Sequence, residues 1–165
     1  MREIIVTRRR LGTTHIIQVD DADYDRVIAA GPWSINSVGC RTFYAFRNVP
    51  CPTGQKTTQY LHRFILGEAC AGLQVDHIDG NGLNDQQPNL RVCTKAENGC
   101  NQQLRKTTIS GFKGVSWITD EQRWRAQIGV GGRRLHLGRF DTPEEAHAAY
   151  CAAAIRSYGE FARFK

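Results

Sequence analysis

Four side chains in the middle of the chain have the types and the order that metal-assisted hydrolysis requires. They are Asp76, His77, Asn89 and Asn98. Asp76 and Asn98 offer the hard oxygen ligands that magnesium takes while it keeps several waters for a substrate phosphate. His77, directly beside Asp76, is a group that can remove a proton from an attacking water near neutral pH. A divalent ion and a histidine base together are sufficient for hydrolysis of a phosphodiester bond.

Each of these residues also has a common structural explanation when it is taken alone. Aspartate–histidine pairs are frequent, and asparagines in turns usually serve the backbone geometry. The joint spacing of the four residues favours a catalytic site instead. A calcium-binding loop that begins at Asp79 is excluded, because its twelfth position needs a glutamate and is Leu90.

A β-hairpin followed by a helix is expected to bring the four residues together. Residues 73–77 and 89–92 are typical of two strands, and the polar run 79–85 between them is typical of a long turn. Thr94 and Glu97 have the spacing of a capping box, so a helix is expected to begin there. This ββα core is predicted to cover about residues 72–104.

The residues before this core are predicted to be β-rich and irregular. Runs of β-branched or aromatic residues at 4–6, 15–19 and 42–46 indicate strands. The acidic run 20–23 is expected to cap a short helix through Ala30, and residues 60–66 indicate another short helix that Gly67 ends.

A three-stranded sheet and an alanine-rich helix are expected after a polar linker. The strand candidates are residues 112–118, 123–130 and 133–140, and the helix runs from a Thr142 cap to about Tyr158. Alternation places apolar side chains on one face, against the alanine stripe of the helix. The opposite face carries Ser116, Arg123, Arg125, Gln127, Arg134 and His136. Such a face is either solvated or fits the DNA major groove, where guanidinium and amide groups pair with base edges.

The hairpin and helix region resembles the HNH motif of phage and intron homing endonucleases. The resemblance rests on Val75-Asp76-His77-Ile78-Asp79-Gly80-Asn81, on Asn84, on Pro88-Asn89-Leu90-Arg91, on Glu97-Asn98, and upstream on Leu61-His62-Arg63-Phe64-Ile65-Leu66-Gly67. It covers roughly residues 15–104. It implies that His77 is the general base, that Asp76 is a metal ligand, and that Asn89 holds the loop so that the histidine points correctly.

Asn98 stands where many members of that family have the final histidine of the motif. Asparagine keeps an oxygen ligand there and argues against zinc at this position. The resemblance therefore implies one divalent cation, Mg²⁺, with Mn²⁺ as the alternative. His62 and Arg63 are candidates for phosphate contacts, and a packed histidine at a helix start is the alternative for His62.

The C-terminal region resembles the plant ethylene-response-factor, or Apetala-family, DNA-binding domain. The matching segments are Gly111-Phe112-Lys113-Gly114-Val115, Trp124-Arg125-Ala126-Gln127-Ile128, Leu137-Gly138-Arg139-Phe140 and Glu144-Glu145-Ala146-His147-Ala148-Ala149-Tyr150. Ser116 stands where an arginine is usual, and His136 where a tryptophan is usual. The DNA sequence that this chain reads therefore cannot be taken over from the plant proteins.

Charge and cysteine content agree with a nucleic-acid partner in a reducing compartment. The formal net charge is +6, which favours binding to a polyanion. The six cysteines form no C-x-x-C pair, so neither disulfides nor a structural zinc site is indicated. No run of residues is apolar and long enough to cross a membrane, and the N-terminus lacks the apolar core of a signal peptide, so we expect a cytoplasmic protein. The resemblance to phage and intron endonucleases implies a phage or bacterial origin.

The predicted fold is α+β, with a β-rich N-terminal region, a ββα-metal nuclease core, and a three-stranded antiparallel sheet packed on one helix. The expected domains are an HNH endonuclease domain over 1–105, a linker over 106–110 and an Apetala-like domain over 111–165. The expected function is site-specific hydrolysis of double-stranded DNA by a metal-dependent endonuclease. The alternative is a non-catalytic DNA-binding protein or regulator.

Overall fold

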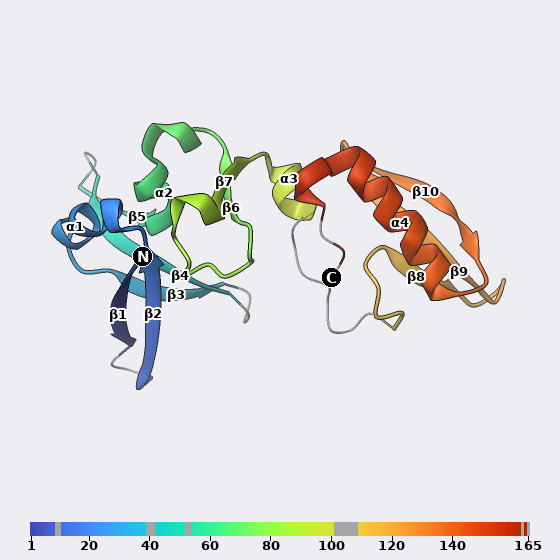
Figure 1. Cartoon of the computed structure of the whole chain (residues 1–165), viewed down its shortest axis with the longest axis horizontal. Coiled ribbons are helices and arrows are strands. Elements are labelled where there is room, and N and C mark those ends of the chain that lie inside the picture. The colour runs from blue at the N-terminus through green and yellow to red at the C-terminus, as the bar shows by residue number, and fades with distance from the viewer. Residues whose placement is uncertain (9–10, 39–41, 52–53, 101–108, 163, 165) are drawn as a thin grey trace. The chain divides into compact units, whose positions relative to one another are not determined.

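The chain folds into two compact units, Met1–Cys93 and Thr94–Lys165 (Figure 1). The computed structural model describes residues 1–8, 11–38, 42–51, 54–100, 109–162 and 164. The predicted α+β class is confirmed, with several antiparallel sheets and a C-terminal helix packed on a sheet. The division between the units falls inside the expected core 72–104. Residues 101–104 of that core and 106–108 of the expected linker lie outside the described residues.

The described residues of the first unit form three small antiparallel sheets, in the orders β1-β2, β3-β4-β5 and β6-β7. Its elements are β1 (Arg2–Arg8), β2 (Thr13–Val19), α1 (Asp21–Ala29), β3 (Ser34–Val38), β4 (Thr42–Pro50), β5 (Lys56–Tyr60), α2 (Leu61–Leu66), the 3-10 helix η1 (Gly67–Cys70), β6 (Gln74–His77), the 3-10 helix η2 (Gln87–Asn89) and β7 (Leu90–Cys93). Sequence patterns do not predict β3 and β5, because their residues are mostly polar and lack apolar alternation.

The core of the first unit lies between β2, α1, β4 and α2. Ile17, Val19, Val27 and Leu61 are fully buried there. The long turn between β6 and β7 is attached to this core through β2. The Gln18 amide donates to the carbonyl oxygen of Leu83 at 2.8 Å, and the Asp85 amide donates to the Gln18 carbonyl at 2.8 Å. The β6-β7 hairpin is therefore held in place by the N-terminal region.

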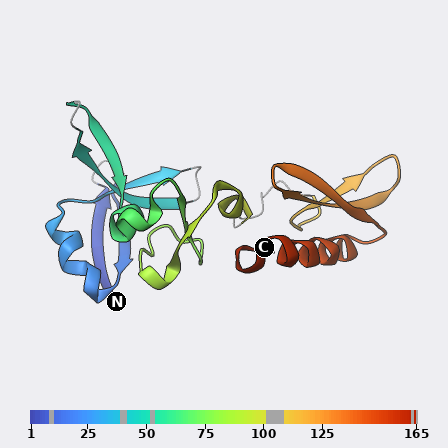
Figure 2. The same ribbon diagram turned by 90° about the horizontal axis from the view of Figure 1, so that it is seen from above.

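The second unit contains α3 (Lys95–Cys100), β8 (Val115–Ile118), β9 (Arg123–Val130), β10 (Arg133–Phe140), α4 (Pro143–Tyr158) and the 3-10 helix η3 (Gly159–Phe161). The strands form one antiparallel sheet in the order β10-β9-β8. Helix α4 lies as a separate layer against one face of this sheet, as Figure 2 shows. The buried residues between the two layers are Val115, Ala126, Ile128, Ala146, Tyr150, Ala153 and Ala154. This confirms the predicted packing of an alanine stripe on the apolar face.

Two predicted helix caps are present. The Thr94 hydroxyl accepts from the Glu97 amide at 3.3 Å, and the Glu97 carboxylate accepts from the Thr94 amide at 2.7 Å, which is a reciprocal capping box. The Thr142 hydroxyl accepts from the Glu145 amide at the start of α4. Among the described residues, no helix is long and apolar enough to cross a membrane.

A bulge in β10 changes one detail of the predicted alternation. Leu135 pairs with Ile128, but the register shifts between His136 and Gly138, so that Arg139 pairs with Arg125. Strict alternation from Arg134 would place Arg139 on the helix side of the sheet. The bulge places it on the polar face instead, where sequence reasoning did not expect it.

Candidate active site and nucleic-acid interface

His77 ends strand β6 and is held on several sides. Its side chain is only 4% exposed, and its Nε2 atom lies 3.2 Å from Oδ1 of the fully buried Asp85. The His62 ring meets it edge-on at 5.2 Å between centroids, and the Tyr44 ring is tilted against it at 5.7 Å. These contacts fix the orientation of the imidazole, as a general base requires.

Asp76, the preceding residue, contacts a different partner. Its Oδ2 atom accepts from Nε of Arg91 at 2.9 Å and lies 2.8 Å from the Arg91 NH2 group, and both side chains are largely buried. Arg91 is the residue opposite Asp76 in the β6-β7 register. Because a carboxylate has two oxygens with several lone pairs, an ion and the guanidinium can share Asp76.

Asn89 closes the turn that follows His77. Its amide group donates to the Asn84 carbonyl at 2.7 Å and to the Asp79 carboxylate at 3.1 Å, and its side-chain oxygen accepts from the Asp79 amide at 3.0 Å. The Asn84 side chain also donates to Asp79, at 2.8 Å. Asn89 thus joins both ends of the turn between β6 and β7, which is the geometry expected of a residue that holds this loop.

Hydrogen bonds keep Asp79 ionised within this turn. Desolvation by burial acts against ionisation, but bonds from the Asn84 side chain, the Asn81 amide and the Asn89 side chain outweigh it and lower the pKa of the Asp79 carboxyl. The turn therefore carries a fixed negative charge next to the proposed site.

Asn98 lies in α3, where its amide donates to the Thr94 carbonyl at 3.0 Å. It belongs to the second unit, whereas Asp76 belongs to the first. That Asp76 and Asn98 meet at one ion therefore remains a prediction.

His62 is packed against aromatic rings. It stacks on Tyr60 at 5.5 Å, and its buried Nδ1 has no hydrogen-bond partner among the described residues. Burial, followed by the nearby His77 and Arg63, lowers the pKa of His62 to about 3, so the ring is neutral at pH 7. Arg63 donates to the carbonyls of Leu73 and Cys70, at 2.9 and 2.8 Å, and holds the segment before β6. Phosphate contacts by these two residues remain predictions.

Asp85 is a site residue that sequence reasoning missed. It occurs in the polar run 79–85, where the sequence alone indicates only a turn. Burial raises the pKa of Asp85, and the hydrogen bond and charge of His77 oppose that rise. Asp85, His77 and His62 each offer a ligand atom, and these atoms lie within 4.8 Å of one another. Two nitrogens and one oxygen suit a transition metal, whereas the Asp76 and Asn98 oxygens suit magnesium.

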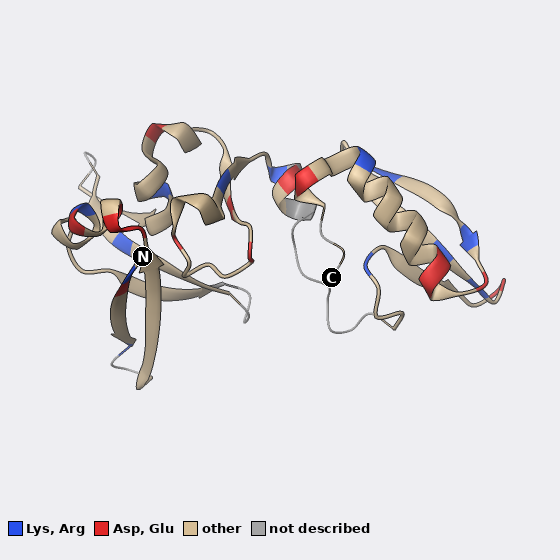
Figure 3. Cartoon of the chain, viewed as in Figure 1, with Lys and Arg blue, Asp and Glu red and all other residues tan. Residues whose placement is uncertain are grey.

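The polar face of the C-terminal sheet gathers the predicted DNA-binding residues. Ser116 is paired with Arg125, and His136 with Gln127, so their side chains share one face. By alternation the face also includes Arg123 and Arg134, and the bulge adds Arg139. Arg123 is paired with Asp141 at 2.7 Å, and Arg139 with Glu121 at 3.0 Å. Figure 3 colours the Lys and Arg positions blue, and several of them lie on the strands of this sheet.

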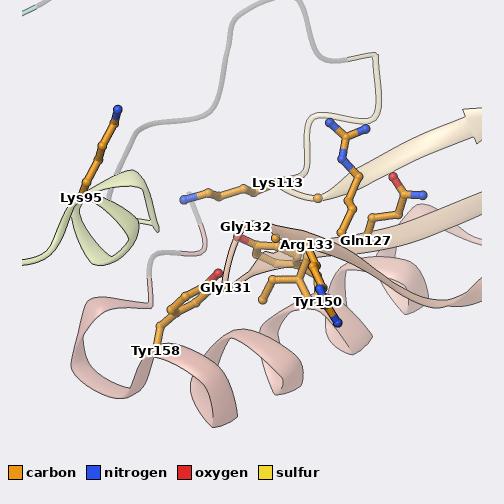
Figure 4. A pocket seen from close by; sticks show the side chains of 12 residues that line it. Lys95, Lys113, Gln127, Gly131, Gly132, Arg133, Tyr150 and Tyr158 are labelled. Carbon is orange, nitrogen blue, oxygen red and sulfur yellow. The ribbon is translucent and has the colours of Figure 1, made fainter.

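A pocket of about 560 Å³ lies in the second unit, beside the β9-β10 turn (Figure 4). The cationic residues that line it are Lys95, Lys113, Arg133 and Arg134, and no carboxylate lines it among the residues that the structure describes. Tyr150 and Tyr158 of α4 form another part of its wall. The pocket adds positive potential at the end of the sheet, which agrees with an anionic partner.

Comparisons with known proteins assign a class to both segments. The HNH endonuclease family model matches residues 60–100, which contain α2, the β6-β7 hairpin and α3. The AP2 domain model matches residues 110–160, which contain the sheet β8–β10 and α4. The chain therefore belongs to the HNH endonuclease family and carries an AP2 domain after its nuclease segment. Members of this family generally use a divalent metal, and both kinds of domain bind DNA.

Individual relatives agree with this assignment. Protein 3.8 of Escherichia phage T7 is 36% identical over 94 residues, which is 57% of this chain and 77% of that protein. The uncharacterized HNH endonuclease L560 of Acanthamoeba polyphaga mimivirus is 36% identical over 107 residues, and the match spans 62% of this chain but only 54% of the mimivirus protein. The ethylene-responsive transcription factor WRI1 of Arabidopsis thaliana is 43% identical over 53 residues, or 31% of this chain and 12% of the plant protein. No solved structure matches the chain.

Proposed function

We propose that the protein is a metal-dependent, site-specific endonuclease that hydrolyses phosphodiester bonds in double-stranded DNA. The observation that carries the proposal is the buried and oriented imidazole of His77, next to Asp76, in a segment that matches the HNH endonuclease family. A histidine held in this way is suited to remove a proton from water.

In this proposal each residue of the motif has one task. His77 takes a proton from the water that attacks the phosphorus atom. Asn89 holds the turn between β6 and β7, and thereby the end of the strand that carries His77. The Asp76 carboxylate and the Asn98 amide oxygen would hold a divalent cation, Mg²⁺ or alternatively Mn²⁺. When bound, such an ion stabilises the negative charge that develops on the leaving oxygen.

The C-terminal domain chooses the DNA in this proposal. A nuclease domain over 1–105 cuts, a linker over 106–110 connects, and the AP2 domain over 111–165 reads sequence through the polar face of its sheet. Arginine and glutamine side chains on neighbouring strands can pair with base edges in the major groove. The relatives of this segment include plant transcription factors, which agrees with a role in sequence recognition.

The test is cleavage of supercoiled plasmid by the purified chain with Mg²⁺, with and without a chelator. We predict that His77→Ala lowers the cleavage rate by roughly 10²–10⁴-fold, the usual effect of removing a general base, while DNA affinity is kept. His15→Ala is the control, because His15 packs on Phe43 and has no role in the proposed site. Cleavage by His77→Ala within tenfold of the wild type would contradict the assignment.

The same assay tests the alternative function. A chain that binds DNA tightly but never cuts it, with any divalent ion, would be a DNA-binding regulator that retains the nuclease fold. The matches to transcription factors in the AP2 segment are the observation that favours this alternative. The gel also distinguishes nicked circles from linear DNA, and so separates cleavage of one strand from cleavage of both.

A further inference from the structure

The burial of Asp85 has no evident structural benefit. Its side chain is fully buried, and its Oδ2 atom has no hydrogen-bond partner among the described residues. Its other oxygen faces His77 at 3.2 Å. An apolar residue at a purely structural position would avoid the cost of burying a carboxylate with an unsatisfied oxygen. A buried polar group that is only partly satisfied is more typical of a functional site.

The backbone around Asp85 is fixed from outside the turn. The Asp85 amide donates to the Gln18 carbonyl at 2.8 Å, and the Gln18 amide donates to the Leu83 carbonyl at 2.8 Å. Gly82 lets this segment lie close to β4, because a Cβ atom at position 82 would come within 2.5 Å of the Phe43 carbonyl oxygen and 2.6 Å of the Tyr44 ring. The Asp85 carboxylate is therefore presented to His77 by strand β2 of the N-terminal region.

Two rings also lie against His77. His62 and Tyr44 pack against it, and the His62 imidazole is uncharged at pH 7. These rings restrict the position of the His77 ring, and a hydrogen bond donated to Asp85 would decide which of its two nitrogens carries the hydrogen.

We propose that Asp85 is a positioning residue for the general base: it accepts a hydrogen bond from Nε2 of His77 and leaves Nδ1 as the nitrogen that takes the proton from water. The inference rests on the proposed function, because it needs His77 to be the base. Asp85 does not touch the substrate and acts only through His77.

The proton balance of this step is simple. One O–H bond of the attacking water breaks as its oxygen approaches phosphorus, and the proton goes to Nδ1 of His77. The hydrogen on Nε2 stays in its bond to Asp85, and the positive charge of the imidazolium lies beside the carboxylate. The imidazolium later returns its proton to solvent. Asp85 is neither protonated nor consumed.

A double-mutant cycle tests the proposal with the full chain. Single-turnover cleavage with excess enzyme is measured for the wild type and for Asp85→Ala, His77→Ala and the double variant. We expect Asp85→Ala to lower kcat by on the order of 10²-fold, at the lower end of what loss of a base costs, with little change in KM. In the His77→Ala background the same substitution should lower the rate by less than about twofold, because the group through which it acts is gone.

Asp85→Asn provides a second variant that keeps the shape of the side chain. Its amide oxygen can accept the bond from Nε2. The cleavage rate of Asp85→Asn should therefore be at least tenfold higher than that of Asp85→Ala. If Asp85→Ala does not fold, as judged by thermal unfolding, the cycle is run with Asp85→Asn and Asp85→Leu instead. Asp23→Asn is the matched control: Asp23 is also a buried carboxylate of the first unit, but its partners are Arg26 and Gln87.

The outcomes separate this inference from the proposed function. An equal loss of rate from the Asp85 substitution in both backgrounds would show a purely structural role and overturn the inference. So would an Asp85→Ala rate within twofold of wild type. If His77→Ala itself cuts normally, the proposed function fails, whatever Asp85 does.

Discussion

At the scale of single residues, four acidic or histidine side chains are buried among the described residues of the first unit, and three of them belong to the proposed site. Asp23, the exception, is satisfied by a 2.6 Å ion pair with Arg26. Asp76 is paired with Arg91, while His77 and Asp85 face each other. Since burying charge is costly unless it is compensated, this grouping of polar burial is a stronger mark of function than any one residue.

The metal ligands give the first prediction at this scale. Asp76→Ala should abolish metal-dependent cutting, whereas Asn98→Asp should retain part of it, because aspartate also offers a hard oxygen ligand. The readout is the cleavage rate as a function of Mg²⁺ concentration.

Loss of folding must be separated from loss of the ion in that experiment. Removing Asp76 breaks its ion pair with the largely buried Arg91, and breaking a buried pair typically costs roughly 3–5 kcal/mol of stability. Asp76→Asn avoids the cavity, and Arg91→Ala shows the effect of breaking the pair alone. Normal Mg²⁺ dependence in a folded Asp76 variant would refute this metal site.

His62 gives a prediction for stability against pH. Its folded-state pKa is about 3, below the value of 6.5 for an unperturbed histidine, so the unfolded chain binds more protons between these values. The stability that depends on neutral His62 is therefore complete above pH 6.5 and is lost as the pH falls toward 3. Between pH 7 and pH 4 the loss should be about 3 kcal/mol. Urea unfolding of the wild type and of His62→Gln at both pH values measures this loss of stability. If the free energy of unfolding changes equally with pH in both proteins, the lowered pKa of His62 is contradicted.

At the scale of elements, the predictable parts were those with a strong local signal. Strands β9 and β10 have the predicted bounds, and α4 begins at the predicted threonine cap. Strands β3 and β5 lack such a signal, since Ser34, Asn36 and the run 56–59 are polar. The bulge at Leu137 and the pairing of Asp85 with His77 depend on contacts between distant segments, which no local pattern contains.

Two glycines before β8 give a matched pair for the packing of α4 on the sheet. Both have positive φ, but a Cβ at Gly114 would come within 2.1 Å of the Tyr150 ring, whereas nothing lies within 4 Å of one at Gly111. Gly111→Ala should cost only the backbone strain, about 1–2 kcal/mol. Gly114→Ala should cost about 1–3 kcal/mol more, because the ring must move. If both substitutions lower the free energy of unfolding by the same amount, the close approach of Gly114 to the Tyr150 ring does not contribute to stability.

At the scale of the whole molecule, residues outside both family matches contribute to the site. The HNH match begins at residue 60, yet β2 supplies the Gln18 backbone that fixes Asp85, and β4 supplies Tyr44. The N-terminal region therefore forms a scaffold for the β6-β7 hairpin, which carries the proposed general base. The net charge of +6 is a second property of the whole chain, and it favours association with DNA of any sequence.

The final prediction separates that general attraction from sequence reading. Arg134 lies on the polar face of the sheet and Arg156 lies in the last turn of α4, on the other layer, so Arg134→Ala and Arg156→Ala remove the same charge from different places. If the sheet reads bases, Arg134→Ala should lose roughly 1–3 kcal/mol of discrimination between sites, whereas Arg156→Ala should keep the site pattern. A pure phosphate contact would instead weaken binding to all sequences and reduce its salt dependence.

Cut sites of both variants, and of a chain without residues 110–165, are mapped on one long DNA at equal salt. We expect the shortened chain to cut weakly and with relaxed specificity, because the proposed reading face is gone while the motif residues remain. Arg125→Ala should resemble Arg134→Ala, since both side chains lie on that face, where the Arg125 Nε donates to Ser116 at 3.3 Å. If the shortened and full-length chains cut identical sites with equal efficiency, the C-terminal sheet does not read DNA. Specificity would then have to come from the nuclease segment alone.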